Sequence, residues 1–123
     1  MSDHRQSLGK TGEALALKFL KRRGYKILET NYRTRLGEID IIAKQKKTIV
    51  FVEVKTRHTE NYGNPKAAVT PQKQRKISMV ALTYLKEVQK SDSKARFDVV
   101  AISNAGSQPQ VELVQNAFEL AYP

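Results

Sequence analysis

The sequence of 123 residues contains no cysteine, which excludes disulfide bonds, thiolate zinc sites and thiol nucleophiles. Its two histidines, His4 and His58, are too few for a histidine-rich metal site. No apolar run approaches the roughly 18 residues of a membrane-spanning helix. The N-terminal segment alternates charged and apolar residues and lacks the apolar centre of a signal peptide. We therefore expect a cytoplasmic protein with no membrane partner.

Acidic side chains are scarce relative to basic ones. The chain has 22 Lys and Arg against 12 Asp and Glu, a formal net charge of +10 at pH 7. Such a charge on a small chain favours a polyanionic partner, most often nucleic acid. The alternative is a basic surface that only maintains solubility. The length suits about one domain.

The order of predicted elements indicates an α/β fold. Apolar residues recur at helical spacing over 7–23, and Gly24 is placed to end that helix. A second helix is predicted from Thr70, as N-cap, and Pro71, at the first helical position. Strands are predicted at 25–32, 38–43, 49–55, 97–102 and 111–114, and a short helical turn at 116–120. This order predicts a mixed sheet flanked by helices.

Carboxylates interrupt two of these predicted strands. In IVFVEVK every residue is apolar until Glu53, and in EIDIIA the acidic residue inside the apolar run is Asp40. Burying a carboxylate costs several kcal/mol unless it is paired or binds a metal. Since side chains alternate along a strand, the pattern of the second segment places Ile39 and Ile41 on one face and Glu38, Asp40 and Ile42 on the other.

A hairpin centred between Lys46 and Lys47 would place these carboxylates together. In that register Asp40 lies opposite Glu53, with Cβ atoms about 4.5–5.5 Å apart. Like charges so close are destabilising unless a cation lies between them, and oxygen ligands suit Mg²⁺ or Mn²⁺. The alternative is a plain Glu38–Lys55 ion pair, with Asp40 paired to an arginine from elsewhere.

Two resemblances follow from these residues. Asp40 followed by Glu53-Val54-Lys55 resembles the D…(D/E)xK signature of restriction-endonuclease-like nucleases, although Ile39 replaces the proline that often precedes the aspartate. Over about residues 8–118 the chain resembles the YraN-like family of small bacterial proteins, which are similar to archaeal Holliday junction resolvases. The segments that carry this second resemblance are GEALALKFL, GYKILETNYR, GEIDIIA, FVEVKTR, GNPKAAVTPQKQRKI and RFDVVAI.

The resemblance implies a restriction-endonuclease-like α-β-β-β-α-β core, formed as a single nuclease domain over residues 1–123. It implies a DNA endonuclease that uses Mg²⁺ or Mn²⁺ to hydrolyse phosphodiester bonds, with branched or structured DNA as candidate substrate. Asp40, Glu53 and Glu13 would hold the metal, and Lys55 would position or activate the attacking water. Without the resemblance, Glu13 is equally well explained as an exposed helix carboxylate.

Two further alternatives concern activity and assembly. The chain can instead be a nucleic-acid-binding module that keeps the nuclease fold without turnover. Junction resolvases need two sites, so a homodimer is also a candidate.

Several residues are candidates for contact with nucleic acid. Lys73 and Lys76 lie in the first turns of the second helix, where positive charge opposes the helix dipole and so hints at an external anion. A solvated helix face is the alternative. Gln72 matches a position near which related nucleases carry a site-facing glutamine or lysine, and Arg57 directly follows the strand that holds Glu53. Two other polar residues have separate interpretations: His58 is a candidate general base, and Asp98 is predicted to pair with an arginine instead of binding metal.

Overall fold

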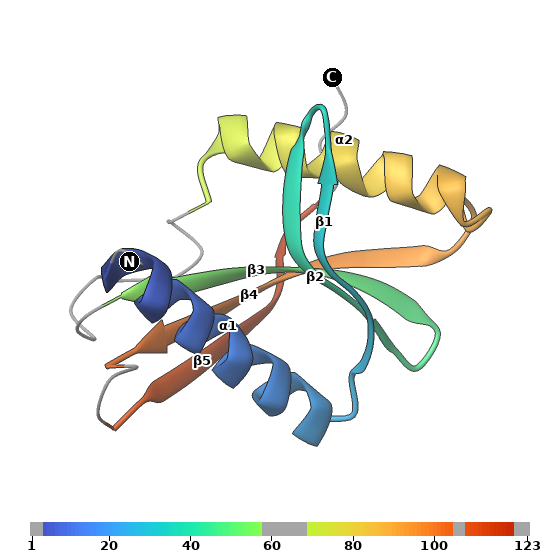
Figure 1. Cartoon of the computed structure of the whole chain (residues 1–123). Coiled ribbons are helices and arrows are strands. Elements are labelled where there is room, and N and C mark those ends of the chain that lie inside the picture. Colours follow the sequence, from blue (N-terminus) through green and yellow to red (C-terminus); the bar gives the residue numbers. More distant parts are fainter. Residues whose placement is uncertain (1–3, 58–68, 105–107, 120–123) are drawn as a thin grey trace.

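A computed structural model describes residues 4–57, 69–104 and 108–119, and for residues 4–10 it describes the backbone only. The predicted order of elements is confirmed (Figure 1). The helices and strands of this part of the chain are α1 (His4–Arg22), β1 (Lys26–Thr34), β2 (Gly37–Gln45), β3 (Thr48–Arg57), α2 (Pro71–Glu87), β4 (Lys94–Ser103) and β5 (Gln110–Phe118).

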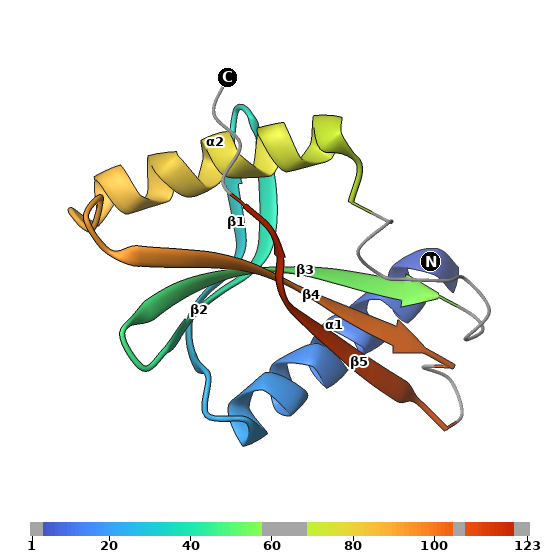
Figure 2. The same ribbon diagram turned by 180° about the vertical axis from the view of Figure 1, so that it is seen from behind.

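The five strands form one mixed sheet, as predicted. Their spatial order is β1-β2-β3-β4-β5, with β3 and β4 parallel and the other neighbours antiparallel. The parallel pair requires a crossover connection, and α2 supplies it. The two helices lie on opposite sides of the sheet (Figures 1 and 2). The α-β-β-β-α-β core implied by the family resemblance is therefore confirmed.

The ends of both helices follow local sequence signals. Gly24 has φ 86°, so it ends α1 in the left-handed conformation that glycine adopts without steric cost. At the start of α2, the Thr70 side chain accepts the amide hydrogen of Lys73 at 3.2 Å, and Pro71 is the first helical residue. Both predicted boundaries are confirmed.

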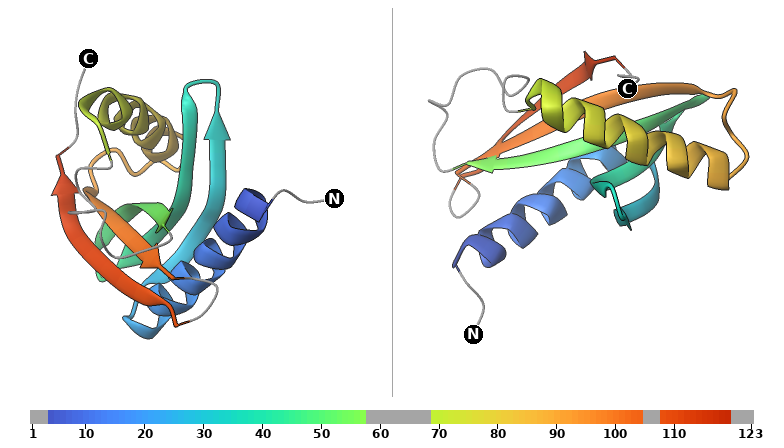
Figure 3. Two further views of the ribbon diagram at one scale, coloured as in Figure 1. Left: turned by 90° about the vertical axis from the view of Figure 1, so that its left-hand side faces the viewer. Right: turned by 90° about the horizontal axis from the view of Figure 1, so that it is seen from above.

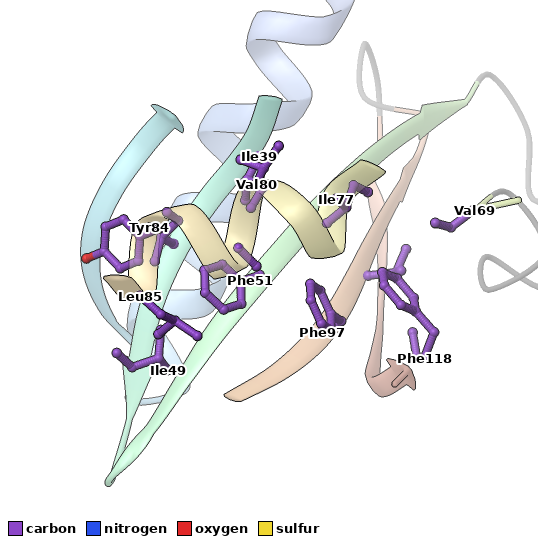
Figure 4. Packing of buried hydrophobic residues seen from close by; sticks show 14 residues of the cluster. Ile39, Ile49, Phe51, Val69, Ile77, Val80, Tyr84, Leu85, Phe97 and Phe118 are labelled. Atoms are coloured by element: carbon purple, nitrogen blue, oxygen red, sulfur yellow. The ribbon is translucent and has the colours of Figure 1, made fainter. Parts of the chain in front are cut away.

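The sheet separates two hydrophobic clusters. The cluster beneath α2 contains Phe51 and Phe97 of the central strands, packed against Val80 and Tyr84 of the helix (Figure 4). The cluster beneath α1 contains small and branched side chains from the same strands, with Leu20 as its largest helical member. Burial on both faces explains the unbroken apolar runs at residues 49–52 of β3 and 99–102 of β4.

The first two strands curl out of the sheet as a hairpin that stands beside α2 (Figure 3, left). Gly37, near the tip of this hairpin, comes close to α2: a Cβ added there would lie 3.6 Å from Val80. The curl brings Ile39 into the α2-side cluster with Ile42, whereas Ile41 packs in the α1-side cluster. The predicted shared face of Ile39 and Ile41 is therefore wrong, because strict alternation fails where β2 bends.

The predicted helical turn at 116–120 is also wrong. β5 extends through Phe118 as a strand. Asn116 has φ 53°, and the pairing register of β4 with β5 shifts next to it, so the strand bulges without ending. The amide hydrogen of Asn116 is accepted by Asp98 Oδ1 at 2.9 Å, and Ala117 is buried beyond the bulge.

No helix in the described part of the chain is both long enough and apolar enough to cross a membrane.

Candidate functional site

The β2–β3 hairpin has the predicted register. Gln45 pairs with Thr48 across a two-residue loop in which Lys46 has φ 55°, and the last pair of the ladder is Ile41 with Val52. The ladder therefore stops one pair short of Asp40 and Glu53. On the other side of β2, Ile39 pairs with Tyr32 of β1 and Ile41 pairs with Thr30, but Asp40 between them does not pair with β1.

Asp40 replaces the missing ladder contact with its side chain. Its Oδ2 accepts the amide hydrogen of Val54 at 2.8 Å. A strand amide lies in the plane of its sheet, so the Asp40 carboxylate sits between β2 and β3 where the two strands part. The break in the ladder thus coincides with the candidate site residue Asp40.

The environment of Asp40 is unusual for a carboxylate. Burial, followed by the negative charge of Glu53, raises the pKa of Asp40 to about 7. The hydrogen bond from Val54 opposes that rise, while Glu13 and Glu38 add to it. Strongly perturbed carboxyl groups gather at functional sites. The pKa therefore indicates that Asp40 and Glu53 lie close enough to interact, as the register predicted.

Glu53 meets a cation from α2. Its Oε1 lies 2.5 Å from Lys73 Nζ, and the two side chains are 13% and 45% exposed. Lys55 is exposed two residues further along β3, so alternation places it on the same face as Glu53. Lysines of a strand and of a helix thus flank one carboxylate.

Glu13 lies at the border of this site. Its Oε1 accepts a hydrogen bond from Asn31 Nδ2 at 2.9 Å, and its charge reaches Asp40. Among the residues that the structure describes, however, no three or more His, Asp and Glu side chains form a group that could hold a metal ion. The structure brings Asp40 and Glu53 together, but Glu13 does not complete a three-carboxylate cluster.

The other candidate contacts lie in different surroundings. Gln72 and Lys76 are exposed in the first turns of α2, near Lys73. Arg57 is only 8% exposed, and its guanidinium contacts Ser103 and Glu112. His58 lies outside the described residues. A role for Arg57 in nucleic-acid binding remains a prediction, and its burial makes it the least accessible of the four candidates.

The alternative Glu38–Lys55 ion pair is wrong. Glu38 instead pairs with Arg33 across the β1–β2 hairpin, with 3.4 Å between Nε and Oε2. The parting of β2 from β3 separates Glu38 from the end of β3, so the cross-strand partner comes from β1.

The prediction for Asp98 is confirmed. Its buried carboxylate accepts two hydrogen bonds from Arg96, each 2.9 Å long, and one of 2.8 Å from the Tyr25 hydroxyl. These contacts join β4 to the chain that follows α1, and none of them involves Asp40 or Glu53. Asp98 therefore belongs to the framework of the fold.

Asn31 is the residue that sequence reasoning missed. It interrupts β1 with φ 52°, and its amide holds Glu13 beside Asp40. Asparagine is several-fold enriched at positive φ. An asparagine inside a predicted strand was a signal of irregular backbone, but no sequence pattern indicated its contact with Glu13.

Known proteins resemble this chain over nearly its whole length. Residues 12–102 match the model of the uncharacterised protein family UPF0102. A UPF0102 protein of Geobacter metallireducens is 57% identical over 99% of this chain and 100% of its own. Another, from Desulfosudis oleivorans, is 52% identical over 97% and 95%. A third, from Geotalea uraniireducens, is 55% identical over 95% and 93%. The chain therefore belongs to the UPF0102 family, which confirms the YraN-like resemblance of its motifs.

Proposed function

We propose that the protein is a metal-dependent endonuclease that hydrolyses phosphodiester bonds in branched or otherwise structured DNA. The observation that carries the proposal is the proximity of Asp40 and Glu53 at the point where β2 leaves β3. The Glu53 charge helps to raise the pKa of Asp40 to about 7 although Lys73 pairs with Glu53, and a divalent cation between the two carboxylates would relieve this repulsion. A net charge of +10 supports a nucleic-acid substrate.

The donor set fits a hard divalent cation. Asp40 and Glu53 provide carboxylate oxygens, and one oxygen of Asp40 is already oriented by the Val54 amide. A metal ion on Glu53 would compete with the Lys73 ammonium, which contacts its Oε1. Asp40 and Glu53 would hold Mg²⁺ or Mn²⁺, with Glu13 near enough to act through an intervening water. Such an ion polarises a phosphoryl oxygen and lowers the pKa of bound water.

The basic residues around the pair suit a phosphate. Lys55, exposed beside Glu53, can neutralise a phosphate oxygen or orient the attacking water as a compact point charge. Gln72, Lys73 and Lys76 lie on the first turns of α2, whose N-terminal dipole also favours an anion. A phosphodiester bound there would lie between the helix and the carboxylates. A chromosomal substrate would place the protein in the cytoplasm.

The proposal is tested with the full chain and labelled junction, flap and single-stranded DNA in the presence of Mg²⁺ or Mn²⁺. We expect the wild type to cleave, and Asp40→Asn or Glu53→Gln to lose at least two orders of magnitude in rate, the loss typical of removing a main charge-stabilising group. Asp92→Asn, an exposed carboxylate between α2 and β4, is the matched control and should cleave normally. Undiminished cleavage by both site variants would overturn the assignment.

A second candidate is a nucleic-acid-binding module without turnover. It is favoured by the Lys73–Glu53 ion pair and by the lack, within the described residues, of a group of three potential metal ligands. This candidate predicts salt-dependent binding, no product with any divalent ion, and unchanged affinity in Asp40→Asn. Competition between DNA and RNA at matched salt identifies the preferred nucleic acid. Sedimentation with and without junction DNA tests for the homodimer that cleavage of two strands would require.

A further inference from the structure

One hollow of the surface contains Glu13 from the proposed metal site and five residues that the proposed function does not use. It lies between α1 and β1, has a volume of about 470 Å³, and is lined by Glu13, Ala14, Leu17, Thr30, Asn31 and Arg33. Asn31 lies opposite Asp40 in the β1–β2 register without pairing to it, and the negative charge of Glu13 helps to raise the pKa of Asp40. The hollow therefore lies on the α1 side of β1, at the strand position that faces Asp40 of β2.

The two ends of the hollow differ in chemistry: one is apolar with an amide and a carboxylate beside it, and the other is basic. Near α1, Ala14 and Leu17 offer apolar surface for a sugar or base. The hydrogen-bonded pair of Asn31 and Glu13 stands beside it, and amide and carboxylate groups are the ones that bind base edges. The volume of the whole hollow lies in the range of pockets that take small ligands, which is sufficient for one nucleotide.

Arg33 forms the other end. Its side chain is 76% exposed, and its Nε lies 3.4 Å from Oε2 of Glu38. Exposed pairs of this kind contribute about 0–1 kcal/mol, so Arg33 can exchange that carboxylate for a phosphate, which its planar fork binds with two parallel hydrogen bonds. Arg33 is two residues beyond Asn31, which is about 7 Å along the strand.

We propose that this hollow binds the nucleotide adjacent to the phosphate held at Asp40 and Glu53, with the phosphate of that nucleotide on Arg33. The base must leave its stack to bind, because contact of its face with Ala14 and Leu17 requires a face that a stacked base does not offer. The partner is therefore a single-stranded or splayed DNA strand, such as a flap or the arm of a junction. This inference rests on the proposed function, since Asp40 and Glu53 define the neighbouring phosphate.

The chain offers a matched control on the same side of the sheet. A hollow of about 360 Å³ near the end of α1 is lined by Phe19, Arg23, Val111, Glu112, Leu113 and Gln115. It has the same kinds of group: an arginine, a carboxylate, an amide and apolar side chains. Arg23 lies ten residues beyond Glu13, about 15 Å along the helix. Arg23 also packs over the Phe19 ring, 4.5 Å from its centroid.

Because the chain has no cysteine, one introduced thiol is unique. Ala14→Cys and Val111→Cys are each mixed with flap DNA that carries a thiol tethered to a single-stranded base, and disulfide-linked complexes are counted. We expect Ala14→Cys to form the complex and Val111→Cys to form little. A fully paired duplex that cross-links to Ala14→Cys as well as the flap does would overturn the requirement for an unstacked base.

Affinity supplies the second measurement, made without divalent ions over a range of salt concentrations. Arg33→Gln should weaken flap binding several-fold and reduce the slope of log affinity against log salt by about 1. Arg33→Lys should keep most of that slope, and Arg23→Gln should resemble the wild type. If the wild type cleaves DNA but both hollows respond equally in the binding measurement, the inference is overturned and the proposed function stands. If the wild type neither binds nor cleaves, both are overturned.

Discussion

The amide of Val54 donates to Oδ2 of Asp40 at 2.8 Å, and this bond stands where the backbone ladder between β2 and β3 has ended. A carboxylate in the plane of a sheet can face groups from both sides. Glu53 approaches Asp40 from β3 and Glu13 from α1, and both raise the pKa of Asp40. The Asp40 side chain thus takes the place of the backbone pairing and also interacts with the other two carboxylates of the candidate site.

The stability of the protein should fall as pH rises towards neutrality because of Asp40. Its pKa rises from 3.8 to about 7 on folding, chiefly through burial and Glu53, so the folded state binds the proton more tightly than the unfolded chain. This contribution is fully present below pH 3.8 and is lost as pH rises through about 7. Asp40→Asn should therefore be more stable than wild type above pH 7, by on the order of 2 kcal/mol after solvent screening, with little difference near pH 4.

Urea unfolding of both proteins at a series of pH values measures this effect. Asp92→Asn, which removes a carboxylate at an exposed position, is the matched control. Glu53→Gln should move the transition to lower pH, because it removes a charge that raises the pKa of Asp40. A stability difference for Asp40→Asn that stays constant with pH would contradict the interpretation.

Removing the Lys73 ammonium should strengthen metal binding by Glu53. Lys73→Gln releases Oε1 from its 2.5 Å contact, and a partly exposed pair contributes up to about 1 kcal/mol, so Mn²⁺ affinity should rise by up to about fivefold. Calorimetry with Mn²⁺ and no DNA measures this directly. Lys76→Gln removes the same charge one turn further along α2, and an equal gain in that variant would show a long-range charge effect instead of a released ligand.

The sequence predicted the part of the site that depends on neighbouring residues. The polar loop around Lys46 and Lys47, with apolar strands on either side, was sufficient for the register that brings Asp40 near Glu53. Pairing of residues distant in sequence, such as Lys73 with Glu53, depends on how α2 crosses the sheet, and no local pattern records it. The contact of Asn31 with Glu13 has the same origin.

Strand periodicity failed where the backbone leaves ideal geometry. The prediction for Ile39 assumed that side chains alternate throughout β2, but the strand bends at Asp40, where its ladders are interrupted. At Asn116 a bulge directs the backbone amide to the Asp98 carboxylate, and β5 continues beyond it. The sequence pattern had predicted a helical turn there. Both irregular positions serve a carboxylate, so the errors fall where side-chain chemistry replaces regular pairing.

Gly12→Ala should destabilise the packing of α1 on β3. A Cβ at position 12 would lie 2.2 Å from Thr56 Oγ1 and 3.2 Å from Thr56 Cβ. Overpacking of this kind costs about 1–3 kcal/mol, which exceeds the gain in helix propensity of about 1 kcal/mol from replacing glycine. Thermal unfolding measures the loss. Adding Thr56→Ala removes the nearer atom and should recover much of it, and simple additivity of the two substitutions would argue against direct contact.

Asp98→Ala should unfold the protein more readily without altering the proposed site. Asp98 is 1% exposed and accepts hydrogen bonds from Arg96, Tyr25 and the Asn116 amide. Removing one member of a buried ion pair costs about 3–5 kcal/mol, and the low end applies because the Arg96 side chain is 22% exposed. Urea unfolding measures the loss. DNA affinity per folded molecule should remain that of the wild type at a temperature where the variant is folded, because the carboxylate holds β4, β5 and the end of α1 together and faces none of the groups around Asp40. A loss of affinity in fully folded Asp98→Ala would instead connect this network to the binding surface.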